Sequence, residues 1–431
     1  MRLPLILFGL AAIGAGQTPE TIALTHANII DGTGAPPQRD QTILVQAGKI
    51  AAVYPSTGRQ PPNGAKVEDL SGKWVLPGLI DAHVHITEQN GEIGPLRDRL
   101  SRLLLHGVTG VRDMAGDARV LGYLAREARL DAPGWADVYY SALMAGPTFF
   151  FEDARVPATS RGMLVGSAPW LRAVDETTDL RLAIAEAKGT GATAIKLYAN
   201  LPASLVKAIA AEAHRQSMLV WAHAAVFPAK PADVVDAGTD VVSHTAYLVW
   251  QAQAHVPPDY RQRAQADFHA VRPDDPRIAA LLADMKERGT ILDATLHVFQ
   301  QQAARSADSV AQGLLPWIYA VTRAAHQAGV PVDAGTDSQG MTSGRPDAVA
   351  AVAEEIALLV KECGFTPVEA IQSATQVSAM AVGRASERGT IARNMAADLA
   401  ILSGDPTADI ANVKKVVAVF KDGKEFHPSE K

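Results

Sequence analysis

The chain has 431 residues, of which 48% are hydrophobic and 20% are charged, so it can bury a large core and is neither disordered nor collagen-like. Its formal net charge is −6, so the chain lacks the excess of basic residues that is typical of proteins that bind nucleic acids or anionic lipids, and we expect no nucleic acid partner. The single cysteine, Cys363, excludes an intramolecular disulfide and is predicted to be a small buried residue on a helix.

The N-terminal segment 1–16 has the pattern of a secretory signal peptide. Met1-Arg2 provides a positive start, and the apolar run from Leu3 to Ala15 is shorter than the roughly 20 residues needed to span a bilayer. Small residues and then polar residues follow. We therefore expect a periplasmic or secreted protein with no membrane association after cleavage; a buried N-terminal strand or helix is the alternative.

The two ends of the remaining chain are both rich in β-forming residues. Within 17–75, three β-rich stretches alternate with turn signals such as Asp31-Gly32 and Ala47-Gly48. Within 386–431, two further stretches precede Asp422-Gly423, which is a hairpin signal. This distribution predicts one small β-sandwich domain formed by both termini.

The middle of the chain, 76–385, alternates apolar strands with helical stretches. Eight strands are predicted, at 75–86, 108–114, 136–144, 193–199, 218–225, 241–247, 291–299 and 331–337. Helices are predicted between most of them, at 97–106, 176–188, 202–216, 277–288 and 345–363. Eight βα units favour an α/β fold of the (β/α)8 TIM barrel type. A doubly wound sheet is the alternative, but no G-x-G-x-x-G follows any of these strands.

Two connections in this barrel are long, at about 145–175 and 248–275. In a barrel both lie at the carboxyl ends of the strands, where substrates bind. Their aromatic residues suit either of two roles: they form a pocket for a bulky apolar group, or they pack the loops together. The residues concerned are Phe149, Phe150, Phe151, Trp170, Tyr247 and Trp250.

The strongest local motif is Leu76-Pro-Gly-Leu-Ile-Asp-Ala-His-Val-His85, at the first predicted barrel strand. Residues i and i+2 of a strand point to the same side, so His83 and His85 both face the barrel interior. Paired imidazoles of this kind commonly hold a metal ion. The motif alone is weak, but its position after the small β domain strengthens it.

Other metal-capable residues end further strands: Lys196 the fourth, His223 the fifth, His244 the sixth and Asp337 the eighth. Each alone has an ordinary structural interpretation, such as a core histidine or a helix cap. Their shared position at the carboxyl ends of barrel strands is instead typical of a metal centre.

Here the sequence resembles the amidohydrolase superfamily of metal-dependent hydrolases, and in particular its imidazolonepropionase-related branch of secreted amidases and dipeptidases. The resemblance covers residues 20–425, including the histidine motif, Gly335-Thr-Asp337 and the tail from Gly389. It implies two divalent metal ions bridged by hydroxide. By matching positions, it implies His83, His85 and Asp337 as ligands of the first ion, His223 and His244 as ligands of the second, and carboxylated Lys196 as a bridge between them.

The chemistry of the residues agrees with this resemblance. A buried lysine with a lowered pKa can react with carbon dioxide to give an anionic carbamate, which can bridge two cations. Two metal ions lower the pKa of a shared water and polarise the scissile carbonyl. Asp337 can accept a proton from the hydroxide and pass it to the leaving nitrogen, as general base and then acid. We expect zinc, although this ligand set also suits other divalent ions.

Substrate contacts are predicted from strand ends and loops. Tyr198 shares the parity of Lys196 and can hydrogen-bond a substrate carbonyl or carboxylate, with ordinary packing as the alternative. His297 is predicted to end the seventh strand and contact substrate. Asp81 shares the parity of His83 and is predicted either to orient a ligand or to serve the strand alone. Arginine and lysine are sparse at the strand ends, which disfavours phosphate esters, although a loop arginine such as Arg155 or Arg345 can hold one carboxylate.

One feature departs from the family pattern. Relatives often carry a histidine in the helix after Gly-Thr-Asp, whereas the segment 348–355 has none. This departure concerns substrate specificity and leaves the predicted ligand set unaffected.

The sequence thus predicts a binuclear hydrolase that cleaves a small-molecule amide, of the dipeptide or N-acyl amino acid type, with a bulky apolar group. One alternative is a mononuclear cyclic-amide hydrolase or deaminase on the same barrel, against which Lys196 argues because such a site needs no bridging carboxylate. The other is a catalytically inactive binding barrel, which would be expected to lose ligands. A homo-oligomer is possible, and the sequence does not identify the oligomeric state.

Overall fold

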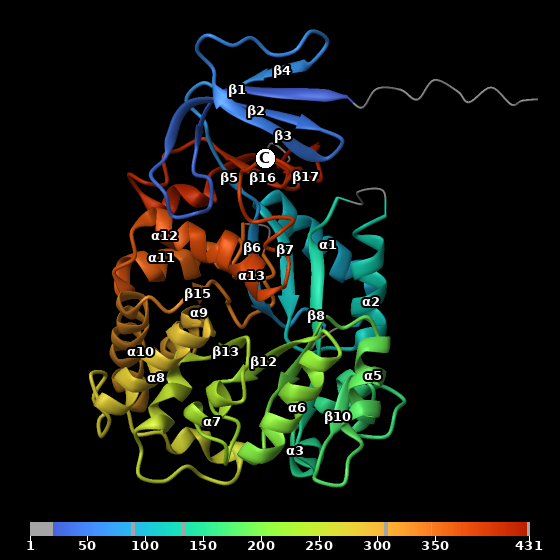
Figure 1. Cartoon of the computed structure of the whole chain (residues 1–431), viewed down its shortest axis with the longest axis vertical. Coiled ribbons are helices and arrows are strands. Elements are labelled where there is room, and N and C mark those ends of the chain that lie inside the picture. Colours follow the sequence, from blue (N-terminus) through green and yellow to red (C-terminus); the bar gives the residue numbers. More distant parts are fainter. Residues whose placement is uncertain (1–19, 88–90, 131–133, 306–308, 346, 429–431) are drawn as a thin grey trace, which may run out of the picture.

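The computed structural model describes residues 20–87, 91–130, 134–305, 309–345 and 347–428. The signal peptide expected at 1–16 lies outside these residues. Within the described part of the chain, no helix is both long and apolar enough to cross a membrane. The expected fold class is confirmed, since a parallel barrel with surrounding helices carries a separate sheet built from both ends of the chain (Figure 1).

The barrel consists of eight strands in parallel register, and each pairs with the next along the chain. They are β6 (Leu79–Val84), β7 (Val108–Asp113), β8 (Asp137–Ala145), β11 (Ala194–Leu197), β12 (Leu219–His223), β13 (Val241–Ser243), β14 (Ile291–Asp293) and β15 (Val332–Asp333). Backbone hydrogen bonds from Ala82 to Ala334 (3.0 Å) and from His85 to Ser338 (2.8 Å) join the first strand to the last. The barrel is therefore nearly closed, and the carboxyl ends of its strands lie together around one end of the barrel axis.

Three of the predicted strands end well before their predicted limits. The sixth ends at Ser243 rather than at 247, and the seventh ends at Asp293 rather than at 299. The eighth ends at Asp333 rather than at 337, so Asp337 follows that strand instead of ending it. The chain leaves the sixth and seventh strands through residues with positive φ, His244 (76°) and Thr295 (53°), so extended pairing cannot continue. The prediction that His297 ends a strand is therefore wrong: it lies in the first turn of a helix.

Helices cover the outside of the barrel and the strand exits. They are α1 (Ile93–Leu105), α2 (Ala118–Glu127), α3 (Pro147–Glu152), α4 (Val156–Ser160), α5 (Leu180–Gly189), α6 (Ala203–Arg215), α7 (Pro231–Asp236), α8 (Pro276–Arg288), α9 (Leu296–Arg305), α10 (Ser309–Ala328), α11 (Val352–Cys363), α12 (Pro367–Gln372) and α13 (Ser378–Ala381), with η1 (Thr245–Gln251), η2 (Tyr260–Gln265), η3 (Ser373–Val377) and η4 (Ile410–Lys414). Helix α8 shows why such segments are helical. The side chain of Asp275 accepts from the backbone of Arg277, Pro276 opens the first turn, and Gly289 ends the helix in a left-handed conformation.

The second unit is an eight-stranded sheet with the order β18-β17-β16-β5-β1-β2-β3, in which β4 pairs with β1. Its strands are β1 (Thr21–Ile29), β2 (Gln38–Gln46), β3 (Lys49–Pro55), β4 (Lys66–Asp69), β5 (Trp74–Pro77), β16 (Leu399–Leu402), β17 (Val416–Lys421) and β18 (Lys424–Phe426). The antiparallel pair β5–β16 joins the two ends of the chain. Apolar residues from both halves then share one core cluster.

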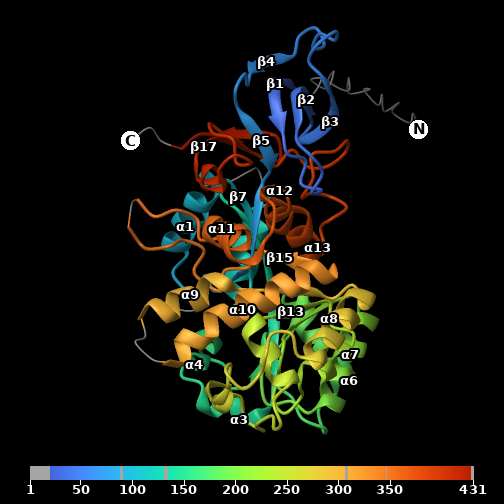
Figure 2. The ribbon, with the colours of Figure 1, turned by 90° about the vertical axis from the view of Figure 1, so that its left-hand side faces the viewer.

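The two units meet through a short link and a buried ion-pair network. Gly78 connects β5 to β6, and a Cβ atom there would lie 2.2 Å from Oγ1 of Thr109, so the close approach requires glycine. At the amino end of β8, Asp137 contacts Arg388 (2.6 Å) and Lys421 (3.1 Å), and Arg388 also contacts Asp398 (2.8 Å). Both views show the small sheet at one end of the molecule and α3, in the first long connection, at the other (Figure 2).

Candidate metal centre

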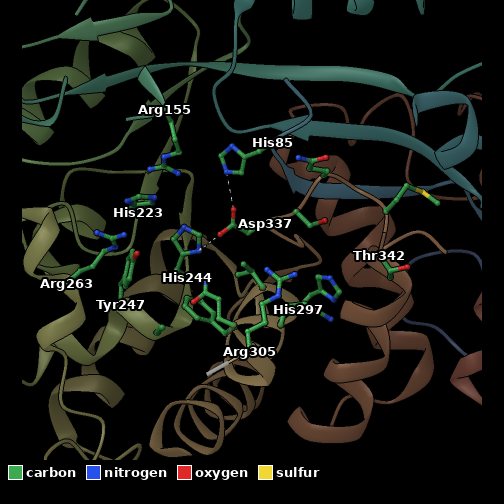
Figure 3. A pocket seen from close by; sticks show the side chains of 18 of the residues that line it. His85, Arg155, His223, His244, Tyr247, Arg263, His297, Arg305, Asp337 and Thr342 are labelled. Carbon is green, nitrogen blue, oxygen red and sulfur yellow. Dashed lines mark ion pairs between the residues drawn. The ribbon is translucent and has the colours of Figure 1, made fainter. Parts of the chain in front are cut away.

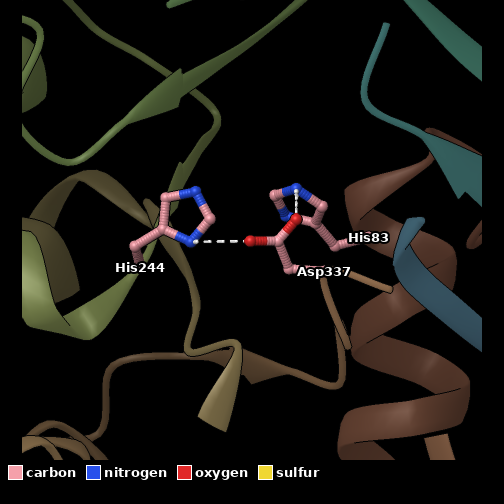
Figure 4. A group of neighbouring side chains, drawn as sticks. All are labelled: His83, His244 and Asp337. Atoms are coloured by element: carbon pink, nitrogen blue, oxygen red, sulfur yellow. Dashed lines mark ion pairs between the residues drawn. The ribbon is translucent and has the colours of Figure 1, made fainter. Parts of the chain in front are cut away.

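Four imidazoles and one carboxylate converge at the carboxyl ends of the barrel strands. His83 lies in β6, His85 follows it, His223 ends β12, and His244 follows β13. Neighbouring rings are close together, with centroids 5.3 Å apart for His83 and His85, 5.1 Å for His83 and His244, and 4.9 Å for His223 and His244. One ligand atom from each of His83, His244 and Asp337 lies within 4.8 Å of the others (Figure 4).

Asp337 lies at the centre of these histidines. Its Oδ1 is 3.0 Å from Nε2 of His85 and 3.4 Å from Nε2 of His83, and its Oδ2 is 3.9 Å from Nδ1 of His244. Burial raises the pKa of this carboxyl group, but the surrounding imidazoles outweigh burial and hold the pKa well below its ordinary value. Asp337 is therefore ionised at neutral pH and carries the negative charge that a cation would need.

Lys196 is fully buried in β11, beside this group. Its Nζ donates a hydrogen bond to Oγ of Ser243 (3.2 Å), and no carboxylate of the described residues lies within ion-pair distance of it. Burial lowers the pKa of Lys196 to about 7. A substantial fraction of the amine is therefore neutral and nucleophilic at physiological pH.

His223 provides a test of whether a cation fits here. The residue is 2% exposed, and among the described residues its Nδ1 has no hydrogen-bond partner. Its ring lies against Tyr198 (centroids 4.1 Å apart) and stacks on Tyr260 (5.5 Å). Burial, with help from Lys196, holds the pKa of His223 well below its ordinary value. A buried, neutral imidazole with a free ring nitrogen is suited to binding a metal ion.

Asp293 is a site residue that the sequence reasoning missed. Its Oδ2 accepts hydrogen bonds from Nδ1 of His83 (2.6 Å), Oγ of Ser243 (2.8 Å) and Nη2 of Arg112 (3.1 Å). The contact fixes His83 as the Nδ1–H tautomer and leaves its Nε2 for a cation. One signal was available in the sequence: Arg112 places a positive charge in a predicted barrel strand, where a buried charge needs an anionic partner.

Asp81 has a structural role rather than contacting an imidazole. Its carboxylate accepts from the backbone (3.1 Å) and the hydroxyl (2.8 Å) of Thr336 and from the backbone of His83 (3.2 Å). Burial raises its pKa to about 8. Asp81 therefore ties β6 to the segment that leads into Asp337.

The residues that hold the site are themselves in sparsely populated backbone conformations. His244 and Asp337 have positive φ angles of 76° and 50°, as does Thr295 (53°), whose hydroxyl lies 2.9 Å from Nδ1 of His244. Strained non-glycine residues of this kind cluster at functional sites, where the surrounding structure holds them.

A cavity of about 1120 Å³ opens above these residues (Figure 3). Its lining includes Tyr198 and His297, the two predicted substrate contacts, as well as His85, His223, His244 and Asp337. Tyr198 is held in place, because its hydroxyl accepts from Nη2 of Arg155 (2.8 Å) and lies 3.4 Å from that of Tyr260. Arg345 does not line the cavity.

The predicted aromatic residues of the long connections mainly pack those connections. Phe149, Phe150, Trp170 and Trp250 are each at most 6% exposed, whereas Phe151 is 80% exposed. Of the six, only Tyr247 is among the residues that line the cavity. The apolar surface of the cavity comes instead from Tyr198, Tyr260, Phe268, Phe299 and a few aliphatic side chains. Six arginines also line it, from helices and loops rather than from strand ends.

Comparison with known proteins agrees with the barrel and its strand-end residues. The profile of the amidohydrolase family matches residues 74–426. The chain is 28% identical to imidazolonepropionase of Ralstonia nicotianae, covering 93% of this chain and 97% of that protein. It is 25% identical to ochratoxinase of Aspergillus niger, covering 99% and 89%. The chain therefore belongs to the amidohydrolase family.

Solved structures show the same fold. The crystal structure of A. niger ochratoxinase superposes with a TM-score of 0.73 at 22% identity, covering 96% of this chain and 97% of that one. A Xaa-Pro dipeptidase solved with bound methionine gives 0.75 at 20% identity, covering 95% and 100%. The expectation of an amidohydrolase that acts as a hydrolase on carbon–nitrogen bonds is thus confirmed at the level of the family.

Proposed function

We propose that this protein is a binuclear metal-dependent hydrolase that cleaves the amide bond of an N-acyl amino acid or a dipeptide. The observation that carries the proposal is the position of Lys196: a buried amine without a carboxylate partner among the described residues, next to four imidazoles and Asp337. Family membership and the dipeptidase and ochratoxinase neighbours support an amide as the substrate.

The donor set fits two divalent cations. His83, His85 and Asp337 would hold the first, His223 and His244 the second, and Lys196 as a carbamate would bridge them. The neutral amine of Lys196 forms a bond to the carbon of carbon dioxide and loses a proton, which converts a repelling cation into an anionic ligand. The orphan Nδ1 of His223 and the fixed tautomer of His83 support the same assignment.

Divalent ions held there supply Lewis acidity and a hydroxide nucleophile near neutral pH. The protein's own residues then handle protons and position the substrate. Asp337, held as a carboxylate, accepts the proton of the attacking hydroxide and delivers it to the leaving nitrogen. The hydroxyl of Tyr198, oriented by Arg155, is placed to bind a carbonyl or a carboxylate of the substrate. His297 provides a ring nitrogen on another part of the cavity lining.

The cavity also limits the substrate. Tyr198, Tyr247 and Tyr260 form one side, which we call the aromatic wall, and Arg155 and Arg263 lie beside it. Such a wall suits a large apolar side chain next to a carboxylate. An amino acid with an aromatic or large aliphatic side chain, acylated on its nitrogen, has both features.

Metal analysis combined with a hydrolysis screen tests the proposal. The purified protein is expected to contain two divalent ions per chain and to hydrolyse members of a dipeptide and N-acyl amino acid library. One ion per chain with cyclic-amide hydrolysis or deamination would support the mononuclear alternative. No bound metal and no turnover after reconstitution with zinc and bicarbonate would support a binding barrel.

We further propose export of the protein, on the basis of the N-terminal sequence alone. Mass spectrometry of the mature N-terminus and fractionation of the producing cells test this. A protein that is found in the cytoplasm and still carries residues 1–16 would contradict export.

A further inference from the structure

The cavity side formed by α1 and α9 carries positive charge that no carboxylate of the described residues neutralises. Arg99 and Arg102 lie on α1 and Arg305 ends α9, and all three line the cavity together with His297. We call these four residues the basic wall. No carboxylate of the described residues forms an ion pair with any of the three guanidinium groups. Arg99 and Arg102 instead donate to the carbonyl oxygens of Ile86 (3.2 Å) and Arg345 (2.6 Å).

Of the other three arginines that line the cavity, two are paired with carboxylates. Arg155 is paired with Asp153 (2.7 Å), and Arg261 is paired with Asp259 (2.6 Å) and Glu152 (2.9 Å). Arg263 lies over the ring of Tyr260, 4.0 Å from its centroid, and has no carboxylate partner among the described residues. Asp98, also on α1, is exposed and forms no ion pair with described residues, so it offsets only part of the charge nearby. Three of the four cavity arginines without a carboxylate partner among the described residues therefore lie on the basic wall.

Helix α9 presents this wall in a fixed orientation. His297, Gln301 and Arg305 are spaced by four residues, so they share one face of the helix, and all three line the cavity. The buried carboxylate of Glu355 accepts from the backbone of Leu296 (2.9 Å) and His297 (2.6 Å), which anchors the first turn. Figure 3 shows His297 and Arg305 on one side of His244, and Arg263 and Tyr247 on the other.

His297 indicates that this surface is built to receive a ligand. The side chain is 3% exposed, and its Nδ1 has no hydrogen-bond partner among the described residues. A buried polar atom left without a partner is costly, and because the ring of His297 lines the cavity, a turn of that ring would bring this nitrogen to a ligand group. Arginine beside such a group favours a carboxylate, which it can bind with two parallel hydrogen bonds.

We propose that the basic wall is a second anion-binding subsite, and that the substrate is an N-acyl amino acid with a second carboxylate at the far end of its acyl group. One carboxylate then lies at the aromatic wall, near Tyr198 and Arg155, and the other at the basic wall, with the scissile amide between them. The inference rests on the proposed amide hydrolysis at the metal centre. It specifies the substrate class as monoamides of dicarboxylic acids.

The test compares N-glutaryl-phenylalanine with N-pentanoyl-phenylalanine, which have acyl chains of equal length and differ in the terminal carboxylate. The wild-type holoenzyme is expected to prefer the glutaryl compound by about tenfold or more in kcat/KM, because the charged pair forms in a partly desolvated cavity. Higher ionic strength should reduce this ratio. Arg305→Gln should lower kcat/KM for the glutaryl compound more than for the pentanoyl compound, so that the ratio falls toward one.

Arg272→Gln is the matched control, since the Arg272 side chain is 80% exposed, is paired with Asp274 and does not line the cavity. It should leave the ratio unchanged. Two results would overturn the proposed subsite while leaving the proposed function intact. In the first, the wild type hydrolyses both compounds with nearly equal kcat/KM. In the second, Arg305→Gln does not change the ratio of the two kcat/KM values.

Direct measurement of ligand binding tests the anion-binding subsite independently of the proposed amide hydrolysis. Calorimetry of the same proteins with glutarate and with pentanoate needs no turnover. Tighter glutarate binding that is lost in Arg305→Gln supports the subsite, even if no amide is hydrolysed and the proposed function fails. Equal binding of the two acids overturns it.

Discussion

Oδ2 of Asp293 lies 2.6 Å from Nδ1 of His83, and the same oxygen accepts from Ser243 and Arg112. His83 therefore faces the candidate metal centre with Nε2, while Ser243 also accepts from the amine of Lys196. One buried carboxylate thus orients His83, a proposed metal ligand, and, through a hydroxyl, the lysine. Burial opposes its ionisation, but His83 and Arg112 outweigh burial and hold its pKa below the ordinary value.

Asp293→Asn tests this relationship. The amide keeps the size of the side chain but removes its charge, so His83 loses its orienting acceptor and Arg112 loses its nearest anion. We expect metal affinity and kcat/KM each to fall by roughly 10-fold to 100-fold. Metal content after dialysis against a graded chelator measures the first effect. The exposed Asp274→Asn variant is the control, and unchanged metal retention in Asp293→Asn would show that His83 does not need this partner.

The histidine motif and the other strand-end residues are predictable because strand parity is a local property. Residues i and i+2 face one side wherever the strand lies, so His83 and His85 follow from six residues of sequence. Parallel strands in a barrel then bring Lys196, His223 and His244 to the same end. The strand pattern therefore predicts that these side chains lie together, without any information from the loops.

Asp293, the helix carrying His297 and the basic wall depend on distant contacts. The seventh strand ends where it does because Glu355, about 60 residues later in the chain, caps the start of α9. The segment 291–299 alone has the pattern of a continuous strand, which does not single out Asp293 and puts His297 at a strand end. The arginines of the basic wall come from α1 and α9, and only the packing of both helices around the cavity brings them together.

Lys196→Ala is expected to lose most activity and much of the bound metal. The substitution removes the proposed bridging carbamate and leaves like-charged cations without an anion between them. A short carboxylic acid added to the variant should restore part of both, because its carboxylate fits the vacated space as a bridging ligand. Wild-type activity or a full metal content in Lys196→Ala without added acid would rule out the bridge.

Reconstitution of the metal-free protein should depend on pH through Lys196. Burial lowers the pKa of this amine from 10.5 to about 7, so the neutral form that reacts with carbon dioxide is present above the folded pKa and is lost below it. The neutral fraction rises from roughly one-tenth at pH 6 to roughly nine-tenths at pH 8. At constant dissolved carbon dioxide, recovery of activity with zinc should therefore accelerate across this interval. Equal rates at pH 6 and pH 8, or no dependence on carbon dioxide, would contradict carbamate formation.

Arg388 should be important for stability rather than for chemistry. Its guanidinium contacts Asp137 of the barrel and Asp398 of the small sheet, and its side chain is only 13% exposed. Arg388→Ala leaves two buried carboxylates short of a partner, so the free energy of unfolding should fall by roughly 3–5 kcal/mol. Urea denaturation measures this fall. Arg393→Ala, an exposed arginine on the same segment, should change it by less than about 0.5 kcal/mol. Similar stability of both variants would show that the network does not couple the two units.

The aromatic wall predicts the preferred side chain beside the scissile amide. In a series of N-acyl amino acids with the same acyl group, Phe and Leu derivatives should have higher kcat/KM than Gly and Asp derivatives, because Tyr198, Tyr247 and Tyr260 offer apolar contact area. Tyr260→Ala removes a ring that packs 5.3 Å from that of Tyr198 and should reduce the advantage of Phe over Gly. Tyr123→Ala, on α2 and outside the cavity, should leave that advantage intact. Faster hydrolysis of the Gly or Asp derivative would refute the apolar subsite without affecting the assignment of the metal ligands.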